Sequence, residues 1–187
     1  MCVLDRWVTC CAQDVMRVRE FLGVMIRRQP RSTQSRSSAA SDVNKRQVQT
    51  SFTEVDGDAM DKFFKSSTSA AIMHGANCQK VMGAGFAKQV KEQLTPLFYL
   101  DQYDTRDATQ RFGSYSAVIV GQVEEEIKIG VNLYTQFNPG ANFDMAALRT
   151  SLKAFTFSIP KDKRSSFTLY LPKIGCGIVG ANWEQVK

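Results

Sequence analysis

His74-Gly75-Ala76-Asn77-Cys78, followed closely by Gly83-Ala84-Gly85, is the stretch that decides how this chain folds. It places the only histidine of the chain, an asparagine and three glycines within a dozen positions, between a short apolar run and an amphipathic helical pattern. Glycines let the backbone approach a ligand closely, and the N–H groups and dipole of a helix N-terminus attract anions. The stretch therefore predicts an anion-binding turn that links a strand to a helix.

A second glycine-rich loop, Gly175-Cys176-Gly177-Ile178-Val179-Gly180, lies near the other end of the sequence and follows a predicted strand. Its spacing matches the G-x-G-x-x-G pattern of dinucleotide-binding turns. The Rossmann form of that site also needs an acidic residue about 20 positions further on, and none stands there in this sequence. Two such loops indicate a ligand with more than one phosphate, without the ribose contact of a nicotinamide dehydrogenase.

The composition indicates a globular protein without a membrane anchor or a disulfide scaffold. Hydrophobic residues make up 43% of the chain, and no apolar run is long enough to span a bilayer. The five cysteines are odd in number and include no Cys-x-x-Cys pair, which is typical of reduced thiols in the cytoplasm. A single histidine argues against a histidine-rich metal site, so we expect neither a metal nor a cofactor.

The basic character of the chain is concentrated in its N-terminal part. Residues 1–50 hold nine basic and four acidic residues, whereas the rest of the chain is close to neutral. Residues 29–41 are rich in Ser and lack core-forming side chains, which indicates a linker. We therefore expect a basic, disordered extension over residues 1–48 and a folded domain over residues 49–187. Contact with nucleic acid is not expected, except through this basic extension.

Strand and helix patterns alternate along the folded part, which predicts an α/β sandwich around a mixed sheet. Both glycine loops follow predicted strands, at the sheet edge where open α/β sheets bind ligands. Pro96 is expected to end the helix that follows the first loop. The predicted strands cover residues 52–55, 70–74, 115–120, 127–134 and 167–171, and the predicted helices begin at Asp58, before Phe86, at Asn142 or Asp144, and at Asn182.

Five short motifs follow one another over residues 50–187: Val55-Asp56-Gly57-Asp58-Ala59, His74-Gly75-Ala76-Asn77-Cys78, Met82-Gly83-Ala84-Gly85-Phe86-Ala87, Asn132-Leu133-Tyr134-Thr135-Gln136 and Leu171-Pro172-Lys173-Ile174-Gly175-Cys176-Gly177. Together they resemble the macrodomain family, and their fixed order makes the resemblance specific. The resemblance implies a three-layer α/β/α sandwich with a mixed central sheet that binds ADP-ribose in a cleft.

The resemblance also implies a role for each motif. Asp58, next to Ala59, would accept a hydrogen bond from the adenine amino group, and Asn77 would contact the distal ribose. Thr135 would be a further ligand contact. The two loops would wrap the diphosphate and distal ribose through Gly83, Ala84, Gly85, Phe86, Gly175, Cys176, Gly177, Ile178 and Val179.

Two positions bear on the branch of the family. The branch that removes ADP-ribose from acidic side chains or DNA uses a lysine and an aspartate, where this sequence has Gln136 and Val179. The histidine in the first loop instead resembles the branch that hydrolyses ADP-ribose 1''-phosphate, with His74 transferring a proton and Asn77 orienting the ribose. Two other functions stay open, namely a non-catalytic ADP-ribose reader and an ADP-ribosyl hydrolase acting on protein or nucleic acid.

Several of these residues can also be explained by a structural role alone. A lone histidine at a strand end is often structural, and asparagine is common in turns because it tolerates left-handed backbone geometry. Cys78 and Cys176 fit small buried residues better than nucleophiles. We expect a monomer. Macrodomains of this type continue beyond an Asn-Trp-Glu segment with the rest of a helix and a strand, so residues 49–187 are expected to be C-terminally incomplete.

Overall fold

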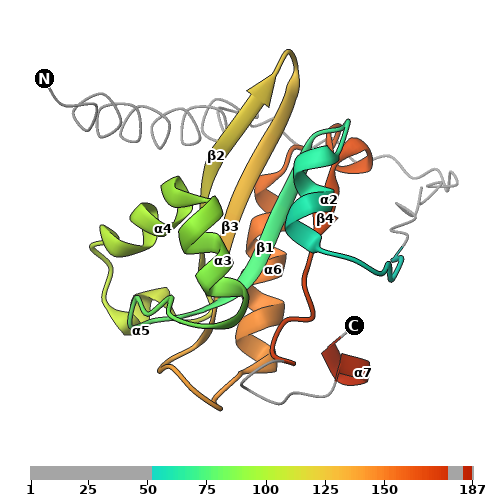
Figure 1. Ribbon diagram of the computed structural model, residues 1–187. Helices are drawn as coiled ribbons and strands as arrows, with labels where there is room; N and C mark the ends of the chain where they lie inside the picture. The colour runs from blue at the N-terminus through green and yellow to red at the C-terminus, as the bar shows by residue number, and fades with distance from the viewer. Residues whose placement is uncertain (1–51, 177–182, 187) are drawn as a thin grey trace, which may run out of the picture.

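The computed structural model describes residues 52–176 and 183–186 (Figure 1). The predicted extension over residues 1–48 and the loop residues Gly177, Ile178 and Val179 lie outside these ranges. The described elements are α2 (Ala59–Lys65), β1 (Ala70–Asn77), α3 (Gly85–Gln93), α4 (Thr95–Gln102), α5 (Ala108–Arg111), β2 (Tyr115–Val123), β3 (Glu126–Gln136), α6 (Met145–Ser158), the 3-10 turn η1 (Arg164–Ser166), β4 (Thr168–Tyr170) and α7 (Trp183–Val186).

The sheet is mixed, as the sequence predicts, with the strand order β2-β3-β1-β4. β1 pairs in parallel with both β3 and β4, and β2 pairs with β3 as an antiparallel hairpin. β1 is central and buried on both faces, which explains why its first half reads as a continuous apolar run. The carboxyl ends of β1 and β3 therefore meet at one edge of the sheet, far from the β2–β3 turn (Figure 1).

Helices cover both faces of the sheet, so the expected three-layer α/β/α sandwich is confirmed (Figure 1). On one face, side chains of α2, α3 and α4 pack on alternate residues of β1, among them Phe63, Val90 and Ile72. On the other face, α6 supplies Leu148 and Phe155, which pack on β1 and β3. Burial of this apolar surface is the main source of the stability of the sandwich.

Aspartate side chains cap the starts of α2 and α6. Asp58 Oδ1 accepts hydrogen bonds from the backbone N–H groups of Met60 and Asp61, at 2.7 and 3.1 Å. Asp144 caps α6 in the same way, through a 2.7 Å bond from Ala147 N. The sequence predicts both starts, since aspartate is a preferred N-cap residue.

One expectation about secondary structure is wrong. Residues 52–55 form no strand; Phe52 and Val55 are 65% and 57% exposed, and alternation alone cannot make a strand without a partner edge. The helix α3 ends before Pro96, as expected, and Pro96 lies in the first turn of a further helix, α4, where its missing N–H costs nothing. The sequence reading therefore misses α4, and with it the short helix α5.

Within residues 52–176 and 183–186, no helix combines the length and the apolar character that a membrane crossing requires.

Candidate functional site

A cavity of about 270 Å³ lies at the sheet edge where β1 and β3 end. The start of α3 and the segment that follows β4 complete its walls. Eight of the predicted site residues line it: His74, Asn77, Gly83, Ala84, Gly85, Phe86, Thr135 and Gly175. A wider depression of about 460 Å³ lies on the outer face of α6, but one helix lines it with no convergent polar groups, so it is not a comparable site.

The structure does not bring every predicted residue to this cavity. Asp58, Ala59 and Cys176 are not among the lining residues. Asp58 is exposed, and its Oδ1 atom is used as the cap of α2. Its adenine contact stays a prediction. Gln136 and Lys173 line the cavity as well, and Lys173 Nζ lies 3.1 Å from a carboxylate oxygen of Glu54.

The first glycine loop forms an open cradle at the N-terminus of α3. Ala84 occupies the cap position but supplies no side-chain hydrogen bond, so no side chain of the described residues caps the first N–H groups of the helix. A Cβ atom added at Gly83 or Gly85 would meet nothing within 4 Å. Gly85 has a φ of +56°, a conformation that favours glycine. The loop can therefore offer backbone N–H groups to an anion, as its sequence predicts.

Gly75 serves the packing of the cavity floor. A Cβ atom there would lie 2.9 Å from Thr135 Oγ1 and 3.1 Å from Ile174 Cγ2. The glycine thus lets β1, β3 and the segment after β4 approach one another closely. Thr135 is buried, and its Oγ1 atom has no hydrogen-bond partner among the described residues, which leaves a polar atom for a ligand.

Asn77 braces the turn that follows β1. Its Oδ1 atom accepts hydrogen bonds from the backbone N–H groups of Gln79 and Val81, and its Nδ2 atom donates to the carbonyl of Val81 at 2.7 Å. These bonds favour the turn role over a free ribose-binding amide. Because Asn77 also lines the cavity, the ribose contact stays a prediction.

His74 is buried at the sheet edge, with 2% of its surface exposed. Its Nε2 atom lies 2.6 Å from Oδ1 of Asn132, and its ring lies against Phe86 with centroids 6.1 Å apart. Nδ1 has no hydrogen-bond partner among the described residues. Burial lowers the pKa of His74 to about 4, although the hydrogen bond to Asn132 acts in the opposite direction.

Because the pKa of His74 is low in the folded protein, we expect the free energy of unfolding to depend on pH. The imidazole of His74 binds a proton near pH 6.5 in the unfolded chain but only near pH 4 in the folded chain. Its contribution to the free energy of unfolding is therefore fully present above pH 6.5 and is lost as the pH falls toward 4. Between pH 7 and pH 5 we expect wild type to lose about 2 kcal/mol more than His74→Gln. Urea denaturation of both proteins at each pH measures this difference. Equal losses would show that His74 is protonated normally in the fold.

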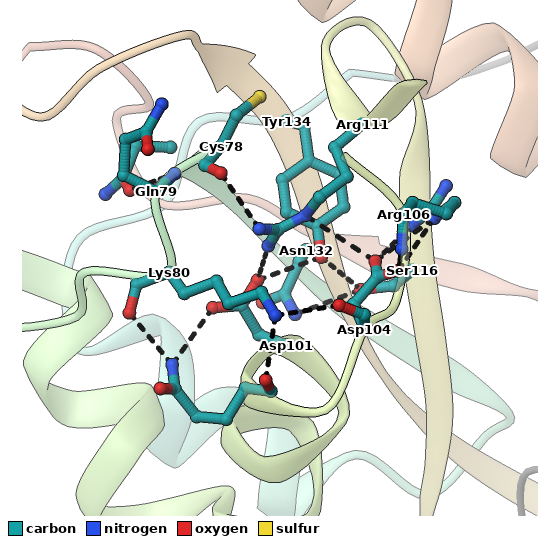
Figure 2. A network of polar contacts seen from close by, with 12 residues as sticks. Cys78, Gln79, Lys80, Asp101, Asp104, Arg106, Arg111, Ser116, Asn132 and Tyr134 are labelled. Carbon is teal, nitrogen blue, oxygen red and sulfur yellow. Dashed lines mark hydrogen bonds and ion pairs between the residues drawn. The ribbon is translucent and has the colours of Figure 1, made fainter. Parts of the chain in front are cut away.

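A buried polar network lies beside the cavity, and the sequence reading missed it (Figure 2). Arg111 and Asp101 are each 1% exposed and form an ion pair. Arg111 also donates to the carbonyl of Cys78 at 2.9 Å and lies over the ring of Tyr134. Tyr134 Oη lies 3.0 Å from Asp101 Oδ1, and burial raises the pKa of Tyr134 to about 12, so it stays a neutral donor.

The same network anchors the turn that carries the glycine loop. Lys80 has a φ of +61°, and its Nζ atom donates to the carbonyls of Gln102 and Asp104 at 2.9 and 2.7 Å. The side-chain amide of Gln102 in turn donates a 2.8 Å hydrogen bond to the carbonyl of Lys80. The turn after β1 is thus tied to the end of α4.

The structure describes two of the cysteines, Cys78 and Cys176, and both are free thiols. Cys78 is buried, and burial raises the pKa of its thiol although Arg111 opposes the shift, so a thiolate is disfavoured. Cys176 is half-buried, with Sγ 3.6 Å from the carbonyl of Ile174. In the part of the chain that the structure describes, no three His, Cys, Asp or Glu side chains are grouped to hold a metal ion.

Solved structures of macrodomains share this architecture. The macrodomain of Mycobacterium tuberculosis DarG aligns with a TM-score of 0.55 at 24% identity, over 72% of this chain and 83% of that one. Thermosipho africanus DarTG in complex with ADP-ribose aligns with a TM-score of 0.51 at 21% identity, over 67% of this chain and 34% of that one. At this identity the likeness establishes the fold, so the protein is an α/β/α domain with the macrodomain fold.

A phage protein is similar in sequence as well. The "Uncharacterized 17.5 kDa protein in tk-vs intergenic region" of Enterobacteria phage T4 is 35% identical over 118 residues, which cover 62% of this chain and 74% of the phage protein. This chain belongs to the same family as that phage protein. No protein-family model matches the chain.

Proposed function

We propose that this protein binds ADP-ribose in the cavity and hydrolyses ADP-ribose 1''-phosphate or a related ADP-ribosyl ester. The observation that carries the proposal is the uncapped N-terminus of α3, whose glycine loop lines the same cavity as His74. A helix N-terminus with a glycine loop suits a diphosphate, and the unpartnered Oγ1 of Thr135 suits a sugar hydroxyl. The ADP-ribose named in the Thermosipho africanus structure supports the choice of ligand.

In the catalytic form of the proposal, His74 is a general base. A water molecule gives its proton to Nδ1 of His74 while its oxygen attacks the phosphorus atom. The bond from phosphorus to the anomeric oxygen breaks, so inorganic phosphate leaves, and ADP-ribose keeps that oxygen, which takes a proton from a second water molecule. Backbone N–H groups of the loop at Gly83–Phe86 would stabilise the developing negative charge.

The rival function, a non-catalytic ADP-ribose reader, is favoured by the environment of His74. A histidine with a pKa near 4 is a weak base at neutral pH, and its buried Nδ1 atom must first become accessible to water. The same cavity serves both functions, so only turnover separates them.

Two measurements on wild type and His74→Gln test the proposal. We expect ADP-ribose to bind both proteins in calorimetry, with Kd values within about tenfold of each other, because glutamine can still donate to Asn132. Release of phosphate from ADP-ribose 1''-phosphate should fall by about 100-fold or more in the variant, the usual contribution of a general base.

Arg149→Met is the control, because Arg149 lies on the outer face of α6 away from the cavity. It should leave binding and turnover unchanged. Binding without turnover in wild type would favour the reader, and equal turnover in wild type and His74→Gln would remove His74 from catalysis. No binding of ADP-ribose to wild type would refute the proposal itself.

A further inference from the structure

A chain of hydrogen bonds runs from Asp101 to His74. Tyr134 Oη lies 3.0 Å from Asp101 Oδ1 and 3.0 Å from Ser116 Oγ. Asn132 Nδ2 lies 3.1 Å from Ser116 Oγ, and Asn132 Oδ1 lies 2.6 Å from Nε2 of His74. Figure 2 shows the part of this chain from Asp101 to Asn132, and His74 lies one bond beyond it.

Each bond in the chain has one allowed direction. The Asp101 carboxylate, paired with the permanent cation of Arg111, can only accept, so Tyr134 donates its single proton to it. The oxygen of Tyr134 is then free to accept from Ser116, whose hydroxyl has one proton to give. The oxygen of Ser116 in turn accepts from an N–H of Asn132.

A second contact fixes the orientation of the Asn132 amide independently. The carbonyl oxygen of Leu97 lies 3.4 Å from Nδ2 of Asn132. A carbonyl beside the amide requires its NH₂ group on that side, because two oxygens would repel each other. Both contacts therefore turn Oδ1 of Asn132 toward His74, and an oxygen acceptor 2.6 Å away requires a proton on Nε2.

We call the hydrogen-bonded side chains of Asp101, Tyr134, Ser116 and Asn132 the relay. We propose that the relay holds His74 as the neutral Nε2–H tautomer and presents Nδ1 as a fixed hydrogen-bond acceptor, with Asn132 as the positioning residue. Nδ1 has no partner among the described residues, so the group that satisfies it must be a donor. A sugar hydroxyl or a water molecule meets that need, whereas a phosphoryl oxygen does not. This last step rests on the proposed function, because it takes ADP-ribose as the ligand.

The proposal restricts the chemistry of His74. A neutral histidine with its proton locked in a bond to Asn132 can take a proton at Nδ1 but has none to give there. His74 thus acts as a base or as an acceptor for a ribose hydroxyl, and protonation of a leaving oxygen falls to another group. The titratable groups of the relay, Asp101, Arg111 and Tyr134, all lie on the far side of Asn132.

The tautomer can be read directly, because the chain contains a single histidine. Long-range ¹H–¹⁵N correlation spectra of the full chain without ligand, recorded at pH 7, should show one protonated nitrogen at Nε2 and one unprotonated nitrogen at Nδ1. A spectrum of the Nδ1–H tautomer, or of a doubly protonated ring, would overturn the proposal. Wild type alone decides this point, whatever the variants do.

Two variants test the positioning role of the relay. Asn132→Asp keeps the acceptor but adds a negative charge beside His74, so the histidine should titrate about one to three pH units higher than in wild type. Tyr134→Phe removes the link to Asp101 and leaves the 3.4 Å contact with Leu97 to hold the Asn132 amide, so the minor tautomer should become detectable. The matched controls Gln122→Glu and Tyr103→Phe change exposed side chains and should leave the spectrum unchanged. A variant spectrum identical to wild type in both relay variants would contradict the positioning role.

Titration with ADP-ribose separates this inference from the proposed function. If both hold, ADP-ribose shifts the Nδ1 resonance and leaves the proton on Nε2. The expected tautomer without any response to ADP-ribose would support the relay and contradict the proposed ligand. Binding of ADP-ribose to a protein whose Nδ1 carries the proton would support the ligand and overturn the relay.

Discussion

Replacing Arg111 by methionine is expected to destabilise the fold by about 3–5 kcal/mol, the usual cost of removing one partner from a buried ion pair. Arg111 is almost fully buried, and its guanidinium pairs with Asp101 while also contacting Asp104 and the carbonyl of Cys78. Methionine fills much of the same volume, so the loss comes from charge and not from a cavity. The carboxylate of Asp101 would be left buried without its cation. Urea denaturation followed by far-ultraviolet circular dichroism measures the change.

A control and a rescue make this result specific. Arg149→Met, on the exposed face of α6, should change the free energy of unfolding by less than about 0.5 kcal/mol. Adding Asp101→Leu to Arg111→Met removes the unpaired charge and should restore part of the lost stability, because apolar side chains of similar size can replace a buried pair. Equal stability of Arg111→Met and wild type would show that the pair contributes nothing to the fold. If the double variant is less stable than Arg111→Met, the fall in the free energy of unfolding instead comes from poorer packing.

The effect would also extend to the site. Arg111 donates to the carbonyl of Cys78, directly after β1, and Asp101 anchors the hydrogen bonds that lead to His74. The ion pair therefore holds the turn that carries the glycine loop. Through Asp101 it also holds the hydroxyl of Tyr134, which begins the chain of hydrogen bonds to His74. A folded Arg111→Met variant should accordingly show a detectable minor tautomer of His74 as well as lower stability, because the contact with Leu97 then holds the Asn132 amide with less support.

The parts of the site that can be predicted from the sequence are those whose residue pattern lies within a single strand or helix. The apolar run before His74 gives β1, and the glycines at 83 and 85 with the following amphipathic pattern give α3. In both cases the signal lies within one strand or one helix, where side-chain periodicity follows burial. The aspartate caps of α2 and α6 are local in the same sense.

The buried network has no such pattern. Asp101 and Arg111 stand on different helices and meet because of tertiary packing, which no short pattern records. Asn132 does carry a signal, since it is a polar residue within the buried part of β3, residues 130–135, and such a group must find a partner. That signal could have placed a second polar residue beside His74, but it could not have named Ser116 and Tyr134. Ser116 lies on β2, and Tyr134, although it lies on β3 like Asn132, is linked to Asn132 only through Ser116.

The expected loss of ADP-ribose binding is largest for Gly83→Asp. Gly83 is exposed at the cavity, and a Cβ atom there meets nothing within 4 Å, so the ligand-free protein should accommodate the change. We expect its free energy of unfolding to stay within about 0.5 kcal/mol of wild type. In the proposed complex the same space holds the diphosphate, and a carboxylate there adds steric conflict to like-charge repulsion worth several kcal/mol. The affinity should therefore fall by about 100-fold or more.

Calorimetry with ADP-ribose and urea denaturation of the same preparation check both halves of this prediction. Gly121→Asp is the matched control, because it adds the same side chain on β2, where the nearest atom is the Cβ of Lys128 at 3.7 Å. Gly121 does not line the cavity, so ADP-ribose should bind this variant as it binds wild type. Unchanged affinity in Gly83→Asp would mean that the phosphates do not lie on this loop. The N-terminus of α3 would then lose its role, and the second glycine loop would have to hold the ligand without it.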